Sequence, residues 1–143
     1  MVSVDRLLFV IALIAVILFG LFLLKRWQLS QAQKAVNGSV KDIITSGKTR
    51  IVYFWSTECN QCKTVQRPIL DRLLTKEGET FLALTTVNVM ESPEEATAWG
   101  VKTVPTTFIL DKKGNVQHIN NGVASENKLL EQLTALMKKK KRV

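Results

Sequence analysis

The longest uninterrupted hydrophobic run lies near the N-terminus, at residues 7–24, where all eighteen positions are apolar or glycine. As a helix rising about 1.5 Å per residue, it nearly crosses the roughly 30 Å hydrocarbon core of a bilayer. Lys25 and Arg26 follow directly, in place of the small residues of a signal-peptide cleavage site, and Trp27 suits the membrane–water interface. The pattern predicts an uncleaved single-pass anchor. A cleaved signal sequence and a buried soluble helix are the alternatives.

After the anchor, polar and apolar positions predict a linker and a first strand. Residues 28–40 are polar and tolerate a helix, with a break expected at Asn37-Gly38. A short helical segment is expected at residues 39–45, and Ser46-Gly47 ends it. Residues 50–55 are rich in β-formers and continuously apolar from Ile51 onward, which is typical of a strand covered on both faces.

Residues 59–75 have helical spacing, with Val65, Ile69 and Leu73 expected on the inner face. Pro68 falls inside this segment and is expected to kink the helix, because it has no backbone N–H to donate.

A second strand is expected at residues 81–90, which are largely apolar and β-branched. A short helix follows, with Ser92 as its N-cap and Pro93 in its first turn. Strands 106–110 and 116–121 are joined by a polar turn typical of a hairpin, and Ser125 caps a last helix.

This order of elements predicts an α/β fold. Two βα crossovers that lead into a terminal hairpin give a mixed four-stranded sheet with helices on both faces. The expected divisions of the chain are an anchor (1–27), a juxtamembrane linker (28–39), the α/β domain (40–137) and a basic tail (138–143).

The net charge is concentrated at the C-terminus. The 143-residue chain carries a formal net charge of +8, and the tail supplies five of these charges through residues 138–142. The tail is either a solvated, frayed end or a contact for anionic lipid headgroups. Because no basic stripe with interleaved aromatic residues runs through the body of the chain, nucleic-acid binding is not expected.

The only two cysteines, Cys59 and Cys62, stand at the junction between the 50–55 strand and the 59–75 helix. A helix N-terminus favours negative charge and so stabilises a Cys59 thiolate. Cys62 lies one turn further on, close enough to form a disulfide with Cys59. Such a pair indicates a dithiol/disulfide redox site. A structural disulfide is the alternative, although it closes a loop too short to stabilise the fold much.

Four features of the sequence occur together: Phe54-Trp55 followed by Cys59-Asn60-Gln61-Cys62-Lys63, then Gly100-Val101-Lys102-Thr103-Val104-Pro105-Thr106, then Phe108-Ile109-Leu110 with Gly114, and then Gly122. In these features, and over roughly residues 40–137, the chain resembles the thioredoxin superfamily. The resemblance implies a thioredoxin-like fold and thiol–disulfide exchange with partner proteins, in which Cys59 forms a mixed disulfide and Cys62 resolves it. It also implies a cis bond before Pro105 and pairing of the Val104 backbone with an extended substrate.

Some residues depart from the pattern of that family and should modulate the reaction. Glu58 stands where thioredoxins commonly have Trp, and its charge should raise the pKa of the Cys59 thiol. Asn60-Gln61 replaces the Gly-Pro of reductase-type thioredoxins. Tyr53 occupies the place of a buried Asp that helps to deprotonate the resolving cysteine, so that proton route is expected to be absent or carried by water. Pro68 falls one residue later than the helix proline of the family.

The sequence thus predicts a membrane-tethered thiol–disulfide oxidoreductase, with reduction of partner proteins favoured over oxidation and with a membrane electron donor. It is similar to anchored thioredoxin-like proteins of the bacterial envelope. Lys25 and Arg26 favour a cytoplasmic C-terminal side. However, long C-terminal domains cross largely regardless of nearby charge, and the cytoplasm, rich in small thiol reductants, has little use for a tethered one. The soluble domain is therefore expected outside the cytoplasm, on the periplasmic side.

Two other functions remain open. Cys59, Cys62 and His118 supply two thiolates and an imidazole, a set that could hold Cu(I) in a metallochaperone module. The copper-delivery members of the superfamily usually have more widely spaced cysteines. A non-catalytic holdase or assembly factor would use the fold but not the thiols. The exchange reaction itself is expected to need neither a resident metal nor a cofactor.

Overall fold

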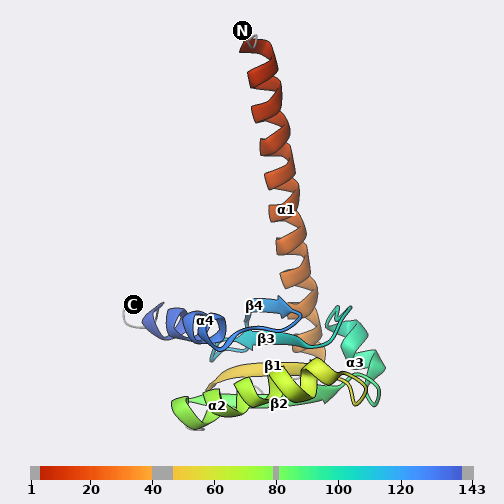
Figure 1. Ribbon diagram of the computed structural model, residues 1–143, viewed down its shortest axis with the longest axis vertical. Coiled ribbons are helices and arrows are strands. Elements are labelled where there is room, and N and C mark those ends of the chain that lie inside the picture. The colour runs from red at the N-terminus through yellow and green to blue at the C-terminus, as the bar shows by residue number, and fades with distance from the viewer. Residues whose placement is uncertain (1–3, 40–46, 79–80, 140–143) are drawn as a thin grey trace.

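The computed structural model describes residues 4–39, 47–78 and 81–139 (Figure 1). Its elements are α1 (Val4–Ser39), β1 (Thr49–Trp55), the π-helical turn η2 (Cys62–Gln66), α2 (Arg67–Glu77), β2 (Leu82–Asn88), α3 (Pro93–Ala98), β3 (Thr106–Leu110), β4 (Val116–Asn121) and α4 (Glu126–Lys139). Beyond Ser39, the helical segment expected at 39–45 lies outside the described residues. β2 is shorter at both ends than the expected 81–90, and the other strands agree with their predicted positions to within a residue.

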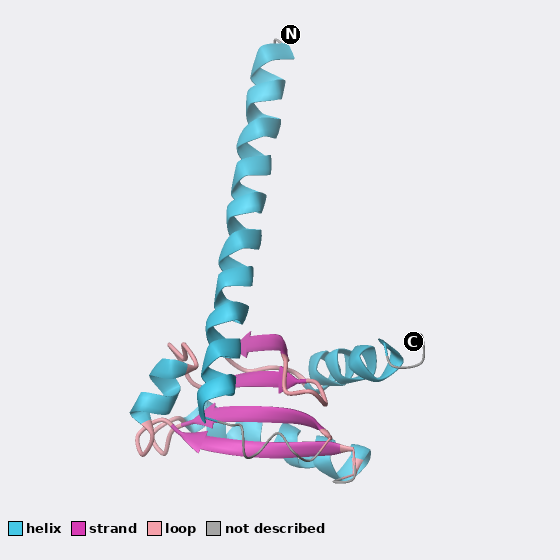
Figure 2. Cartoon of the chain, turned by 180° about the vertical axis from the view of Figure 1, so that it is seen from behind, coloured by secondary structure: helices cyan, strands magenta, loops and turns pink. Residues whose placement is uncertain are grey.

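The first helix, α1, runs without interruption from Val4 to Ser39 and projects far beyond the sheet (Figures 1 and 2). Its segment Asp5–Ser30 is long and apolar enough to cross a membrane, a test that a signal sequence also passes. The predicted break at Asn37-Gly38 is wrong, because the helix continues through both residues. Each costs a helix about 1 kcal/mol or less relative to Ala, which an established helix can absorb.

The sheet has the strand order β2-β1-β3-β4. β1 and β2 are parallel, with Thr49 opposite Leu82 and Trp55 opposite Asn88, and the chain between them crosses over through η2 and α2. β3 pairs antiparallel with both β1 and β4. The mixed four-stranded α/β fold predicted from the sequence is therefore confirmed.

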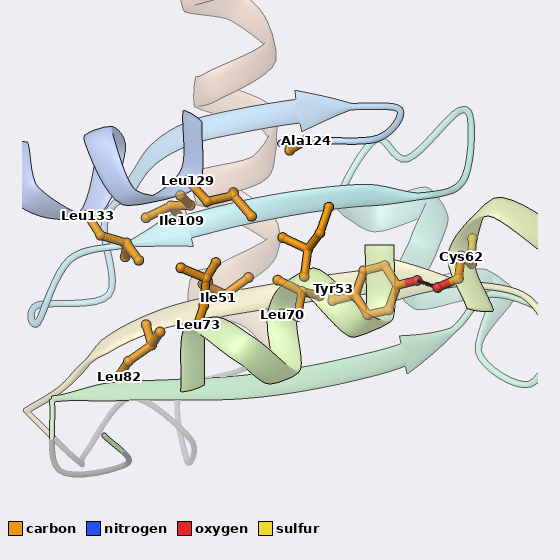
Figure 3. Packing of buried hydrophobic residues seen from close by; sticks show 11 residues of the cluster. Ile51, Tyr53, Cys62, Leu70, Leu73, Leu82, Ile109, Ala124, Leu129 and Leu133 are labelled. Carbon is orange, nitrogen blue, oxygen red and sulfur yellow. Dashed lines mark hydrogen bonds between the residues drawn. The ribbon is translucent and has the colours of Figure 1, made fainter. Parts of the chain in front are cut away.

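Alternate residues of each strand face opposite sides of the sheet, and each side carries its own core. On the α3 side, the rings of Phe54, Trp99 and Phe108 pack with centroids 4.9–5.5 Å apart, and Leu29 of α1 packs against the same cluster. On the other side, α2 and α4 cover the second cluster, which Figure 3 shows from close by. Its buried members include Ile51, Tyr53, Cys62, Ile69, Leu70, Leu73, Leu82, Ile109, Ala124, Leu129 and Leu133.

The two predicted helix starts differ in detail. Pro93 lies in the first turn of α3, as expected, but the Ser92 hydroxyl makes no capping hydrogen bond, and the Ser92 carbonyl accepts the Ala96 N–H at 3.1 Å. At α4, the Ser125 hydroxyl accepts the Lys128 N–H at 3.3 Å, so this predicted cap is confirmed.

Candidate active site

The two cysteines lie just beyond the carboxyl end of β1, where the chain turns into the helix that covers the sheet. The Ser56 carbonyl accepts the Cys59 N–H at 3.2 Å and the Ser56 hydroxyl accepts the Glu58 N–H at 3.1 Å, which closes the turn. Cys59 and Cys62 form a disulfide, with their Cα atoms 5.3 Å apart. The proximity predicted from the spacing of the cysteines is therefore confirmed.

The two sulfurs have different surroundings. Cys59 is half-buried, whereas Cys62 is 1% exposed and belongs to the core cluster under α2 and α4. The Cys62 N–H donates to the Cys59 sulfur at 3.1 Å, so a backbone donor at the start of the helix faces the more accessible sulfur. A donor in this position stabilises a thiolate when the bond is reduced. The arrangement suits attack at Cys59 and resolution by Cys62.

The helix after the cysteines begins with the π turn η2, in which the Arg67 N–H donates to the Cys62 carbonyl five residues earlier. Pro68, with no N–H to donate, follows in the first turn of α2. The kink expected at Pro68 stays a prediction; the irregularity that the structure shows is the π turn, which ends before the proline. A π turn holds one residue more than an α turn, so it accommodates the one-residue displacement of Pro68 noted in the sequence.

Within η2, a polar side chain faces the core in place of the apolar one that was predicted. Val65, expected on the inner face with Ile69 and Leu73, is 41% exposed, and this prediction is wrong. Gln66 is fully buried instead. Gln66 continues the helical spacing of the buried residues Cys62, Ile69 and Leu73, whereas Val65 lies beside this stripe, so choosing the apolar residue selected the wrong neighbour.

Gln66 joins the active-site helix to the loop between β4 and α4. Its Nε2 donates to the Ala124 carbonyl at 3.3 Å, and its Oε1 accepts the Ala124 N–H at 2.7 Å. Both backbone groups are buried, and the Gln66 amide pairs with both of them. Sequence reasoning did not select Gln66. Its only signal is a polar residue four positions after Cys62, within an otherwise apolar stripe.

Tyr53, in β1, forms a hydrogen bond with the same turn. Its hydroxyl donates to the Cys62 carbonyl at 2.9 Å, which Figure 3 shows as a dashed line. Burial raises the pKa of Tyr53 to about 12, against the opposing charge of Arg67. The phenol is therefore protonated at neutral pH, and it donates its proton in the hydrogen bond to the Cys62 carbonyl. It fixes the position of Cys62 and is not available as a base for the Cys62 thiol.

Pro105 lies at the same end of the sheet as the disulfide. The register pairs Phe54 of β1 with Thr106 of β3, so Pro105 and the residue before it adjoin the end of β1. The Val104–Pro105 peptide bond is cis, as the resemblance implied. Pro105 is buried, and its carbonyl accepts the Gly122 N–H at 2.8 Å. Half-buried Val104 packs against the same cluster as Cys59, so the structure brings these two predicted site residues to one region.

The remaining predicted site residues form the surface around the disulfide. Glu58, Asn60 and Gln61 are all exposed, so each is accessible to a partner. His118 lies on β4 opposite Ile109, towards the hairpin and away from the end of β3 that adjoins the site. Over residues 4–39, 47–78 and 81–139, no three His, Cys, Asp or Glu side chains are grouped to hold a metal ion. The structure does not assemble the Cu(I) set of Cys59, Cys62 and His118.

A buried and a half-exposed cysteine joined at a strand–helix junction, next to a cis proline, define a dithiol/disulfide exchange protein. The sequence profile named Thioredoxin matches residues 31–135, and the chain belongs to the thioredoxin family. It is 34% identical over 93 residues to a thioredoxin of Mycobacterium tuberculosis, covering 65% of this chain and 78% of that protein. With a thioredoxin of Rhodospirillum rubrum it shares 28% identity over 95 residues, covering 66% and 88%.

Solved structures agree with this assignment. A malaria parasite protein described as thioredoxin-2, a component of the protein secretion machinery of that parasite, superimposes with a TM-score of 0.55 and 27% identity. The superposition covers 64% of this chain and 82% of that one. The chain is thus a thiol–disulfide oxidoreductase of a family that acts on protein thiols and disulfides. The family match begins inside α1, so part of the predicted linker belongs to the matched region.

Replacing Gln66 with Leu should lower the free energy of unfolding by about 2–4 kcal/mol, because it leaves two buried backbone groups of Ala124 without partners. Urea unfolding of the full chain in detergent, followed by circular dichroism, measures this. Gln61→Leu is the control, because it makes the same substitution at an exposed position, and it should change the free energy of unfolding little. Equal stabilities of the two variants would contradict the role given to Gln66.

Tyr53 should make stability fall at high pH. Its pKa is about 12 in the folded chain and ordinarily 10.0, so the unfolded chain loses the phenolic proton first as pH rises. The contribution is complete below pH 10 and is lost between pH 10 and about 12. Unfolding measured across this window should show a steeper loss for the wild type than for Tyr53→Phe. Parallel curves would argue against a raised pKa.

Removing the charge of Glu58 should lower the pKa of the Cys59 thiol, since an adjacent carboxylate disfavours the thiolate. The thiolate absorbance of a Cys62→Ser protein, titrated with and without Glu58→Gln, measures the shift. Glu131→Gln, an exposed acid on α4, serves as the matched control and should have no effect. An unmoved titration in Glu58→Gln would show that this charge does not tune Cys59.

Proposed function

We propose that this chain is a membrane-tethered thiol–disulfide oxidoreductase that exchanges the Cys59–Cys62 pair with partner proteins, with reduction of partner disulfides favoured. One observation carries the proposal: the bonded sulfurs differ in exposure, with Cys62 buried and Cys59 at the surface and next to a backbone donor. A structural disulfide has no need for this asymmetry, whereas exchange requires one sulfur that partners can reach.

The reaction follows from that asymmetry. In the reduced protein, the Cys59 thiolate attacks one sulfur of a partner disulfide, and the other partner sulfur leaves as a thiolate. Cys62, after losing its proton, attacks the Cys59 sulfur and releases the second partner thiolate. Two electrons have then passed to the partner, and the Cys59–Cys62 disulfide of the present structure remains. A donor in the membrane must supply two electrons to restore the dithiol.

Partner recognition is assigned to the surface around Cys59. The backbone of Val104, ahead of the buried Pro105, would pair with an extended segment of the partner, and Cys59 lies against the same cluster as Val104. The exposed side chains of Glu58, Asn60 and Gln61 would meet the partner next to the reacting sulfur. Their replacement should change the rate or the choice of partner without disturbing the fold.

The tether is assigned to the apolar part of α1, with the soluble domain on the periplasmic side of the cell membrane. The span Asp5–Ser30 belongs to the same helix that contacts α3 and β4 and places Leu29 on the core. This continuity supports an uncleaved anchor, since the span and the domain share one rigid element. The division into anchor (1–27), linker (28–39), domain (40–137) and basic tail (138–143) is kept, with α1 passing through the first two.

Trapping in cells tests the exchange reaction. A Cys62→Ser protein should accumulate mixed disulfides with partners, because Cys59 can attack but nothing resolves the adduct; non-reducing gels display them as bands that dithiothreitol removes. Cys59→Ser is the matched control and should trap almost nothing, since the remaining cysteine is buried. Equal trapping by both variants would refute Cys59 as the attacking residue. A silent Cys59→Ser phenotype with no adducts from Cys62→Ser would favour a non-catalytic holdase.

A membrane-impermeant maleimide tests the sidedness. The cells are first treated with an impermeant reductant, with the outer membrane made permeable and the inner membrane intact. If the domain is extracytoplasmic, the reagent should then label Cys59. A cytoplasmic protein with an exposed thiol is the control for leakage and should stay unlabelled. Labelling of Cys59 only after the inner membrane is broken would place the domain in the cytoplasm.

A further inference from the structure

A groove of about 560 Å³ lies between α1 and the β4–α4 side of the domain. Its lining includes Leu21, Leu24 and Lys25 of α1, His118 of β4, and Lys128 and Gln132 of α4. Figures 1 and 2 show β4 as the strand nearest the N-terminal part of α1, with β1 and β2 further away. The groove is therefore on the side of the domain that faces along the apolar span.

Two leucines of the apolar run line this groove. Leu21 and Leu24 are 58% and 59% exposed, and they are among the last residues of the uncharged segment 7–24. In a bilayer they would lie in the hydrocarbon near its boundary, and Lys25 would lie at the headgroups. Because His118 and Lys128 line the same groove, this part of the soluble domain must lie at the level where hydrocarbon meets headgroups.

The position of the groove is set by a rigid connection. α1 is one helix through this region, and Leu29 packs against the core cluster of Phe54, Trp99 and Phe108 only five residues after Leu24. At about 1.5 Å per residue, that separation is roughly 7–8 Å along the helix axis. The sheet therefore cannot lie far from the membrane surface while α1 stays intact.

The charges around the groove are positive. Lys25 and Lys128 approach it from α1 and α4, and neither forms an ion pair within the described parts of the chain. Burial, Lys25 and Lys128 together lower the pKa of His118 below its usual value. No described lining residue is acidic. Asp111 contacts the lining from outside it: this carboxylate accepts a hydrogen bond from Gln117 and also accepts from Lys113 and Asn115 of its own hairpin.

We propose that this groove binds the phosphate headgroup of an anionic phospholipid, with Lys25 and Lys128 holding the phosphate and Leu21 and Leu24 contacting the acyl chains. The inference rests on the membrane anchor of the proposed function. It goes further by assigning a lipid site and an orientation. A lipid in the groove would hold the β4–α4 side against the bilayer. The strands run across the direction of α1, so the end of β1 that carries the disulfide would face to one side, further from the surface than β4, and would remain open to partners (Figure 1).

Lipid titration of the full chain tests this proposal. The detergent-purified protein is titrated with phosphatidylglycerol or with phosphatidylcholine of the same acyl chains, and native mass spectrometry counts the bound lipids. Each lysine near a phosphate contributes roughly a five-fold gain in affinity, so a preference of about 25-fold for one phosphatidylglycerol is expected. Lys25→Gln with Lys128→Gln should abolish the preference. Lys112→Gln with Lys113→Gln removes the same charge from the exposed β3–β4 hairpin and should keep it.

Reduction of insulin disulfides by each variant shows that the domain is folded, because neither Lys25 nor Lys128 lies at the disulfide. Equal binding of the two lipids, or equal losses in both double variants, would overturn the lipid site. Soluble glycerol phosphate binding as tightly as the lipid would indicate a free-phosphate site and would also overturn it. Release of the chain from membranes by alkaline carbonate would overturn the anchor and this inference together, whereas a retained chain without lipid preference overturns this inference alone.

Discussion

The chemistry of this protein depends on the fixed position of Cys62. Its carbonyl accepts hydrogen bonds from the Arg67 N–H inside the π turn and from the Tyr53 hydroxyl in the sheet. Gln66, four residues on, fastens the turn to Ala124 across a sequence separation of 58 residues. These contacts hold one sulfur in the core and leave the other at the surface. This difference in burial is what assigns attack and resolution to different cysteines in the proposed reaction.

The second organising element is the unbroken helix α1. A flexible linker would let the domain sample many orientations relative to the apolar span. A continuous helix that also packs against α3 and β4 restricts the domain to one orientation relative to the span. The consequence is geometric: the sheet stands with β4 towards the apolar part of α1 and the active-site end of β1 to one side (Figure 1). With the membrane tether proposed above, partners would approach the disulfide from a limited set of directions.

The sheet connects these two features. β1 carries the disulfide at its carboxyl end, and its antiparallel partner β3 begins immediately after the cis proline. Register alone brings residues more than forty positions apart to the same edge of the sheet. β4 then carries the chain back to the loop that Gln66 binds and to α4, which lines the groove beside α1. The exchange site and the groove are thus positioned by the same four strands.

The sequence by itself determined the order of the elements, the cysteine pair, the cis proline and the thioredoxin-like fold. Those features are carried by local signals: hydrophobic period, turn residues and short motifs. Only the tertiary structure decided that Gln66 and not Val65 is buried, that Tyr53 binds the Cys62 carbonyl, that α1 continues through Asn37-Gly38, and that His118 stays apart from the cysteines. The burial of Gln66 and the hydrogen bond of Tyr53 depend on partners distant in the sequence, and the place of His118 depends on the register of β4. The polar Gln66 has a place in the helical stripe, but its burial is favourable only once Ala124 lies beside it, and such contacts exist only after folding.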